Sequence, residues 1–505
     1  MISLGSKRTT FQNAKADILA CLVFEDQKVQ RRQISELKQL SDDLSHALDA
    51  ATFQGKEKET LLLFPKGMRS KRLLLVGLGK LESLSLEKIR RGASLSVKTA
   101  ASHKAASVGL MEPDPEILAT TPLAETSLES VGVALAEGAA LGAYRYDRYL
   151  SDKDKNSALK QFLVLSNNSG RLESLQKGIR FAQIVCEGTY LARDLANAPG
   201  NEIYPETLAR QAVLAGRKTG FRVAVLDERK IRSLKMGGLL GVSQGSAQPP
   251  RFIIMEHNGR NRRMPTVVLV GKGVTFDAGG ISIKPAQGMA EMKMDMSGAA
   301  AVIGTMYSAA RLQLPLRMIG LIPATENLLG GAAMKPGDIL THHGGKTSEV
   351  DNTDAEGRLI LADALSFASK YKPDLVIDLA TLTGACVVAL GSVATGMMGN
   401  DQTMMDRLKD AGERTYERVW QLPLYEEYEK LIKSDIADVK NVGGRWAGAI
   451  TGALFLKKFI GSYKWIHLDI AGTAMLEEAH EYLPKGGSGV GVRLLVDFLR
   501  HWKEN

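Results

Sequence analysis

Acidic and basic side chains are crowded together in residues 352–359, which read Asn-Thr-Asp-Ala-Glu-Gly-Arg-Leu and include Asp354, Glu356 and Arg358. The apolar pattern of residues 359–366 predicts a helix, which places both acids on the preceding loop and first turn, where free helix N–H groups favour anions. In an extended loop, side chains two positions apart point the same way. An isolated acidic pair of this kind is more often a solvated turn, because charged residues are mostly exposed.

A second charged stretch favours a functional site over a solvated turn. Residues 267–270 have the composition of a buried strand, and Lys272, Asp277, Lys284 and Asp295 follow it before an alanine-rich helix. Ligands of open α/β sheets lie at the carboxyl ends of strands, so the acids of both stretches are expected to converge on one crevice. Four carboxylates gathered there cannot all stay ionised without cations.

Two divalent ions about 3.5–4 Å apart would neutralise such a cluster and supply a bridging hydroxide nucleophile. Carboxylate-rich ligation without histidine suits Mn²⁺ or Mg²⁺, and Zn²⁺ also accepts Asp and Glu oxygens. Lys272 could bind a metal only as a neutral amine, and adjacent dications would favour that form by lowering its pKa.

The sequence around these charged residues closely resembles the leucyl aminopeptidase family, the dinuclear-metal M17 peptidases. The resemblance covers residues 271–284, 292–300 and 352–359. Ala278 departs from that family, in which many members carry Ser, but the position is not a ligand. The resemblance implies two catalytic residues, Lys284 and Arg358. It also implies five metal ligands, which are Lys272, Asp277, Asp295, Asp354 and Glu356.

The activity implied by the resemblance is hydrolysis of N-terminal residues, preferably leucine or another bulky apolar residue, from peptides through a bridging metal-bound hydroxide. Lys284 would stabilise the developing oxyanion, although without the surrounding pattern a surface lysine is the more common interpretation. Arg358 is a fixed cationic fork that could hold bicarbonate, the proton shuttle of the family.

The resemblance also points to substrate-binding residues. Leu382 and Gly384 stand where the family hydrogen-bonds the substrate main chain, on a loop that leaves the buried strand 375–379. By the same analogy Met292 would wall the pocket for the first side chain of the substrate. A role for Met292 as core filler is about equally favoured, because Met is a common gap-filler.

His342 and His343 lie near the acidic stretch in the sequence and are alternative candidates for metal ligands. Adjacent residues of an extended loop point to opposite sides, so at most one could face the site, and we favour a non-ligand role for both. Ser282, Ser297 and Cys386 lack the sequence pattern of an activated nucleophile, and no G-x-S-x-G is present.

The composition is that of an ordinary globular chain. The 505 residues are 44% hydrophobic and 24% charged, and 65 Lys and Arg against 56 Asp and Glu give a net charge of +9. This surplus would permit salt-sensitive nucleic-acid binding, but without a recognised motif a solvated surface is favoured. A nucleic-acid-binding or regulatory protein, and a different metallohydrolase on the same carboxylates, are the alternatives to a peptidase.

Three widely spaced cysteines argue against a disulfide framework and fit a reducing cytoplasm. Residues 18–24 are too short for a signal-peptide core. The uncharged run 379–400 is interrupted by glycine, serine and threonine, so it predicts a buried strand and an irregular segment, not a membrane helix.

Strands alternate with helical patterns throughout, which predicts an α/β fold with a mixed, mostly parallel central sheet flanked by helices. We expect a smaller N-terminal α/β domain (1–166), a linker helix (167–198) and a catalytic domain (199–505). Gly77-Leu78-Gly79 follows a predicted strand, but the third glycine of a dinucleotide-binding pattern is missing, so we predict an ordinary turn. The resemblance further implies a homohexamer.

Overall fold

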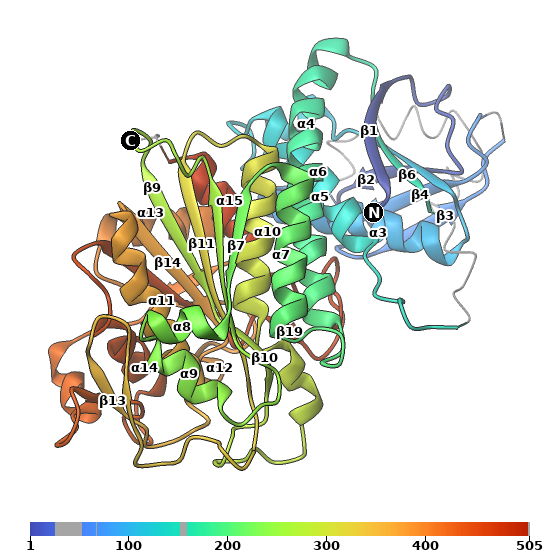
Figure 1. Ribbon diagram of the computed structural model, residues 1–505. Coiled ribbons are helices and arrows are strands. Elements are labelled where there is room, and N and C mark those ends of the chain that lie inside the picture. The colour runs from blue at the N-terminus through green and yellow to red at the C-terminus, as the bar shows by residue number, and fades with distance from the viewer. Residues whose placement is uncertain (26–52, 67, 152–158, 503–505) are drawn as a thin grey trace. The chain divides into compact units, whose positions relative to one another are not determined.

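The computed structural model describes residues 1–25, 53–66, 68–151 and 159–502. Within this range the chain forms two compact α/β units (Figure 1). The smaller comprises Met1–Cys186 together with Glu478–Pro484, and the larger comprises Glu187–Glu477 and Lys485–Asn505. The predicted fold class, two α/β domains with mixed, mostly parallel sheets, is confirmed. The boundaries at 166 and 198 stay a prediction, although α6 (Ser169–Asn197) spans the predicted linker.

The smaller unit is built on a six-stranded sheet in the order β1-β6-β5-β2-β4-β3. All neighbouring strands are parallel except β3 and β4, which are antiparallel. Helices α3 (Leu86–Ser102) and α5 (Leu128–Gly142) pack together closely, since a Cβ at Gly138 would lie 1.9 Å from the Arg90 carbonyl oxygen. The strands are β1 (Ser3–Arg8), β2 (Ile18–Val23), β3 (Thr60–Leu63), β4 (Leu73–Gly77), β5 (Ser107–Met111) and β6 (Gln161–Ser166).

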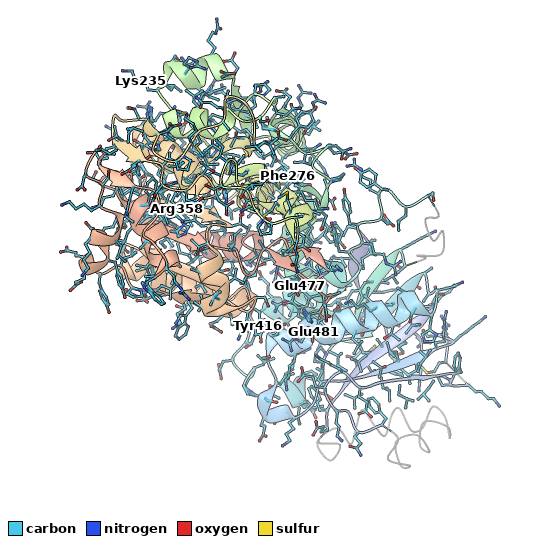
Figure 2. The ribbon with its side chains drawn as sticks, turned by 90° about the horizontal axis from the view of Figure 1, so that it is seen from below. Lys235, Phe276, Arg358, Tyr416, Glu477 and Glu481 are labelled. Atoms are coloured by element: carbon cyan, nitrogen blue, oxygen red, sulfur yellow. The ribbon has the colours of Figure 1, made fainter. Side chains whose placement is uncertain are left out.

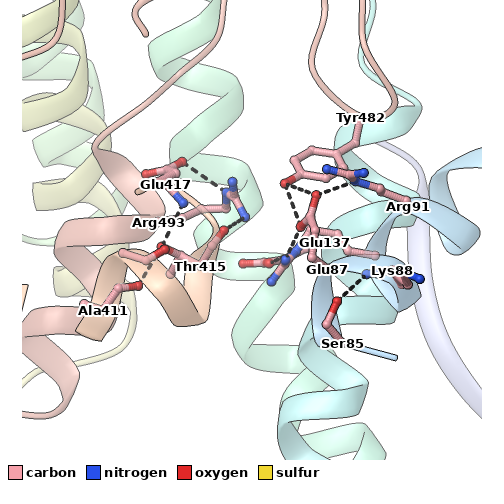
Figure 3. Close-up of polar contacts among 12 residues, drawn as sticks. Ser85, Glu87, Lys88, Arg91, Glu137, Ala411, Thr415, Glu417, Tyr482 and Arg493 are labelled. Atoms are coloured by element: carbon pink, nitrogen blue, oxygen red, sulfur yellow. Dashed lines mark hydrogen bonds and ion pairs between the residues drawn. The ribbon is translucent and has the colours of Figure 1, made fainter. Parts of the chain in front are cut away.

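A short segment from late in the chain completes the smaller unit. Tyr482 is buried, and its hydroxyl donates to the carboxylate of Glu87, with distances of 3.0 and 3.2 Å to the two oxygens (Figure 3). The same carboxylate accepts hydrogen bonds from Arg90 (2.6 Å) and Arg91 (2.9 Å). Residues 478–484 are therefore joined to helix α3 through the Glu87 carboxylate, which accepts hydrogen bonds from Tyr482, Arg90 and Arg91.

The larger unit is built on a nine-stranded sheet whose main path runs β16-β15-β18-β14-β9-β11-β8-β7, with β10 pairing β11. Its central strands β18, β14, β9 and β11 are parallel, and antiparallel pairs lie toward both edges. The strands are β7 (Arg222–Leu226), β8 (Arg251–His257), β9 (Thr266–Gly271), β10 (Gly273–Asp277), β11 (Arg317–Asn327), β14 (Leu375–Ala380), β15 (Thr395–Gly399), β16 (Val419–Gln421) and β18 (Lys464–Asp469).

Helices cover this sheet. Helix α10 (Ser297–Arg311) contacts β9, β11 and β14, with α7 (Pro205–Thr219) and α15 (Val492–Arg500) beside it (Figure 1). Helix α11 (Glu356–Ala368) also packs on β9 and β11, with α9 (Gly237–Ser243) and α14 (Gly448–Lys457) as neighbours. Strands β9 and β14 are fully buried, which explains their near-continuous apolar sequences.

The prediction for residues 379–400 was wrong in part. A buried strand does begin the run, but α12 (Gly384–Leu390) and β15 follow where an irregular segment was expected. Thr383 starts the helix by accepting a hydrogen bond from the Cys386 N–H, and β15 gains its order from antiparallel pairing with β18. Among the described residues, no helix is long and apolar enough to cross a bilayer.

Candidate metal centre and active site

The predicted metal ligands all stand where an element ends or begins. Lys272 follows β9, Asp277 is the last residue of β10, and Asp295 precedes α10. Asp354 lies on the loop before α11, and Glu356 is the first residue of that helix, as its position in the sequence predicted. The carboxyl ends of neighbouring strands meet at one edge of a sheet, so the chain delivers these side chains to one place.

Three of the acids form a compact cluster. One carboxylate oxygen from each of Asp277, Asp354 and Glu356 lies within 4.8 Å of the other two. Asp277 and Glu356 are buried, and Glu356 is only 1% exposed. Carboxylates this close repel one another unless cations or protons intervene.

Two lysines supply positive charge to this cluster. Lys272 Nζ lies 2.8 Å from Asp295 Oδ2 and 2.9 Å from Glu356 Oε1, and it donates to the Thr381 carbonyl oxygen at 2.9 Å. The fourth acid, Asp295, thus joins the cluster through Lys272. Lys284 Nζ lies 2.9 Å from Asp277 Oδ2 and also pairs with Asp354 Oδ1.

Burial and neighbouring charges shift the pKa values of the clustered side chains. Burial raises the pKa of Glu356 to about 8, and the charge of Asp277 adds to this while Lys272 opposes it. Burial likewise raises the pKa of Asp295 to about 6, against the effect of Lys272. Burial alone would lower the pKa of Lys272, but the surrounding carboxylates outweigh it and raise this pKa.

Close packing fixes the Lys272 side chain. A Cβ at Gly357 would lie 2.5 Å from Lys272 Cε and 2.7 Å from Nζ. A Cβ at Gly298 would lie 2.1 Å from the Leu379 carbonyl oxygen and 2.9 Å from the Lys272 backbone nitrogen. A side chain at position 357 would therefore push against the Lys272 side chain, and one at position 298 would push against the backbone of Leu379 and Lys272.

One residue that orients the acids was not predicted from the sequence. Asn327, the last residue of β11, donates its side-chain N–H to Asp277 Oδ1 at 2.8 Å and to the Thr353 carbonyl oxygen at 3.1 Å. Asp277 Oδ1 also accepts from the Gly279 N–H at 2.9 Å. The strand-end argument that selected Asp277 applies equally to Asn327, because β10 and β11 are parallel neighbours.

Arg358 is the third residue of α11, inside the larger unit (Figure 2), and is 7% exposed. Its Nη1 donates to the Asn441 carbonyl oxygen at 2.7 Å, and Nε has no hydrogen-bond partner. Burial lowers its pKa to about 10 although Glu356 and Asp469 favour the charged form, so the guanidinium is cationic at neutral pH. The contact between Asn441 and Arg358 was not predicted from the sequence.

The loop that carries Leu382 and Gly384 connects β14 to α12. Asp469, fully buried at the end of β18, accepts from the Leu382 N–H at 3.1 Å and from the Thr383 hydroxyl at 2.6 Å. Leu382 is half-buried and Gly384 is exposed. Met292 is half-buried on the 3₁₀ helix Met289–Met294, just before Asp295.

Neither adjacent histidine belongs to the carboxylate cluster. The buried His342 ring bonds Ser348 Oγ through Nε2 at 2.7 Å, and Nδ1 lies 3.4 Å from Asp363. The His343 ring bonds the Leu234 carbonyl oxygen through Nδ1 at 2.7 Å. These contacts agree with the structural role favoured for both residues.

Comparison with known proteins shows the family of the chain. The model of the cytosol aminopeptidase family, catalytic domain, matches residues 190–496, and the model of the family's N-terminal domain matches residues 20–153. The chain belongs to the cytosol aminopeptidase family. It is accordingly an enzyme of the peptidase class, and the resemblance of its charged segments to M17 peptidases is confirmed.

Relatives of this aminopeptidase cover almost the whole chain. A probable cytosol aminopeptidase of Geobacter sp. (strain M21) is 48% identical over 459 residues, which are 90% of this chain and 91% of the relative. Among solved structures, a tomato leucine aminopeptidase mutant has a TM-score of 0.87 and 33% identity, covering 99% of this chain and 97% of its own. The bottromycin maturation enzyme BotP in complex with Mn has a TM-score of 0.85 and 34% identity, covering 97% and 100%.

Proposed function

We propose that this aminopeptidase removes N-terminal residues, preferably leucine and other bulky apolar residues, from peptides with two divalent metal ions bound at the carboxylate cluster. The observation that supports this most strongly is the meeting of Asp277, Asp354 and Glu356 within 4.8 Å beside two lysines. The structural relatives include a leucine aminopeptidase and an enzyme in complex with Mn.

The donor set fits divalent cations. Lysine ammonium groups contact three buried carboxylate oxygens, which are Asp295 Oδ2, Asp354 Oδ1 and Glu356 Oε1, whereas the buried Glu356 Oε2 has no hydrogen-bond partner. Buried carboxylate oxygens that lack donors are unfavourable unless a cation contacts them. Oxygen ligands with one amine suit Mn²⁺ or Zn²⁺. The proposed ligands are Lys272, Asp277, Asp295, Asp354 and Glu356.

Two divalent ions held by these five residues would polarise the scissile carbonyl and would supply the hydroxide nucleophile of the predicted mechanism. The protein's own residues would then do three things. Lys284, which is partly exposed beside Asp277 and Asp354, would donate hydrogen bonds to the carbonyl oxygen as negative charge develops on it. Arg358 would hold a bicarbonate ion as proton shuttle.

The third task is to hold the substrate. The backbone of Leu382 and Gly384 would hydrogen-bond the substrate main chain, since the loop leaves the carboxyl end of β14, the strand beside β9. Met292 would form part of the wall for the first side chain, because it is half-buried and precedes Asp295 by three residues.

Hydrolysis of leucine p-nitroanilide tests this proposal. We expect activity to disappear on chelation and to return with Mn²⁺ or Zn²⁺, and anomalous scattering from crystals grown with the metal to show two ions at the five ligands. Glu356→Ala should lose metal and turnover together while circular dichroism stays unchanged. Glu413→Ala removes an exposed glutamate of α13 (Gln402–Thr415) and serves as the matched control. Full turnover in a metal-depleted Glu356→Ala protein would overturn the assignment.

A homohexamer and a cytoplasmic location are further proposals, supported by the family and by the name that its members carry. Light scattering on the purified protein tests the first, with a mass near six chains of 54.7 kDa as the expected result. Fractionation of the source cells tests the second.

A further inference from the structure

A buried histidine of the larger unit takes no part in the reaction as described so far. His467 lies on β18, is fully buried, and its Nδ1 is 2.6 Å from Asp378 Oδ1 on the neighbouring strand β14. The two residues stand directly opposite each other in the strand register. Asp378 is also fully buried, and its other oxygen accepts from Trp465 Nε1 at 2.7 Å. One carboxylate therefore contacts both rings.

The surroundings of His467 favour its charged form. A carboxylate can only accept, so Nδ1 carries a proton. Among the described residues, no other cation forms an ion pair with Asp378. A buried carboxylate without a cation is less favourable than a buried N–H without an acceptor. Burial alone would lower the pKa of His467, but Asp378 outweighs it and raises this pKa.

Two further charged groups act on the ring. Asp469, two residues later on β18, faces the same side of the sheet and favours the charged imidazole, whereas Arg358 of α11 opposes it. The other neighbouring elements add little charge, since β15 places Met398 opposite His467 and α14 has no charged residue before Lys457. The ring thus contacts one buried carboxylate and interacts with a second one through charge.

Asp469 links this pair to the substrate. Its carboxylate accepts from the Leu382 N–H at 3.1 Å, from the Thr383 hydroxyl at 2.6 Å and from the Ala471 N–H at 3.2 Å. The first two bonds hold the loop whose backbone is proposed to bind the substrate main chain. Nε2 of His467 has no hydrogen-bond partner among the described residues, so the ring acts on this loop through charge and not through a contact.

We propose that His467 is a positioning residue of the aminopeptidase: its positive charge, held in place by Asp378, keeps Asp469 where it fixes the substrate-binding loop. Without this charge the two buried carboxylates repel each other, which favours a displaced Asp469. The inference rests on the proposed function, because that function assigns the loop to the substrate main chain.

Fluorescence of Trp465 reports the charge of the ring without metal or substrate, because the indole stacks on His467 with centroids 6.4 Å apart. A stacked imidazolium quenches indole emission, so the emission of the unmodified enzyme should rise in one step as His467 loses its proton with increasing pH. His467→Gln should abolish this step. Asp378→Asn should move it toward acid pH by at least one unit, because an amide no longer favours the charged imidazole.

Kinetics with leucine p-nitroanilide test the effect on the loop. His467→Gln should lower kcat/KM at least tenfold at pH 7, mainly by raising KM, with unchanged metal content, because binding of the substrate main chain is weakened. In Asp378→Asn the loss, relative to the unmodified enzyme at the same pH, should be recovered as the pH falls through the ionisation seen by fluorescence. A purely structural role would lower the rate at every pH. His103→Gln, which replaces an exposed histidine at the end of α3, is the matched control.

The two experiments separate this inference from the function on which it rests. No hydrolysis by the unmodified, metal-loaded enzyme contradicts the proposed function and, with it, the inference. With hydrolysis established, the inference alone is overturned if His467→Gln retains the fluorescence step, if Asp378→Asn leaves the step in place, or if His467→Gln and His103→Gln have equal kcat/KM. Should His467→Gln fail to fold, Asp378→Asn, which keeps the size of the side chain, supplies the same comparison.

Discussion

Gly357 faces the side chain of Lys272 beside the carboxylate cluster: a Cβ added to the glycine would lie 2.5 Å from the lysine Cε. The glycine is the second residue of α11, between Glu356 and Arg358, so the helix that presents a proposed ligand and a proposed catalytic residue also sets the position of Lys272. A residue without a side chain therefore contributes to the geometry of the site.

Gly357→Ala should displace Lys272 and lower both metal affinity and turnover. Overpacking of this kind costs about 1–3 kcal/mol, although alanine is the better helix former. Metal titration and thermal unfolding check both effects. Gly331→Ala is the control, because no atom lies within 4 Å of the added Cβ. A Gly357→Ala enzyme with normal metal affinity would show that Lys272 can adjust freely.

Arg358→Ala should reduce kcat by roughly 100-fold, the lower range for the loss of a proton-transfer group, while about two metal ions per chain remain bound. The reason is that Arg358 contacts the Asn441 carbonyl oxygen and is not a proposed ligand. Elemental analysis and steady-state kinetics with added bicarbonate provide the measurements. Bicarbonate should raise the rate of the unmodified enzyme alone, and the release of both metals by the variant would contradict the assigned role.

Asp469→Asn should misplace the substrate-binding loop. The amide cannot reproduce both the bond that Oδ1 accepts from the Leu382 N–H and the one that Oδ2 accepts from the Thr383 hydroxyl. Misplacement by about 1 Å can cost roughly 100-fold in rate, so kcat/KM should fall to this extent with unchanged metal content. Asp410→Asn, on the exposed face of α13, is the control. Equal kcat/KM in the two folded variants would exclude a positioning role.

Metal affinity should rise with pH. Burial raises the pKa of Asp295 to about 6 and that of Glu356 to about 8 in the metal-free protein, so below these values a metal must displace protons. Each displaced proton changes the affinity by about tenfold per pH unit, and the slope should decrease above pH 8. Calorimetry in buffers of different ionisation enthalpy counts the protons released. Lys272 must also lose its proton to bind a metal, so the affinity should keep rising above pH 8 with a smaller slope. An equal slope below pH 6 and above pH 8 would show that both acids are already ionised.

Local patterns were sufficient to predict the positions of the charged residues on their elements. Buried apolar runs located β9 and β14, and a helical pattern located α11, so Lys272 and Glu356 were placed at element ends from sequence alone. Spatial convergence then followed from the general rule for open sheets.

Contacts that depend on pairing between remote segments could not be predicted in this way. Asn441 follows the two-residue strand β17 (Val439–Lys440), which is too short to show periodicity and is ordered by pairing with β13 (Thr347–Glu349). Asp469 acts on a loop more than 80 residues earlier. Strand β15 has a weakly apolar sequence, and its partner β18 lies much later in the chain.

The segment that holds Tyr482 against Glu87 has a consequence for biosynthesis. A ribosome makes the chain from its N-terminus, so α3 and the six-stranded sheet emerge long before residues 478–484 exist. Until nearly the whole polypeptide has been translated, Arg90 and Glu87 lack their tyrosine neighbour. The unit that leaves the ribosome first is thus completed only when translation is nearly finished.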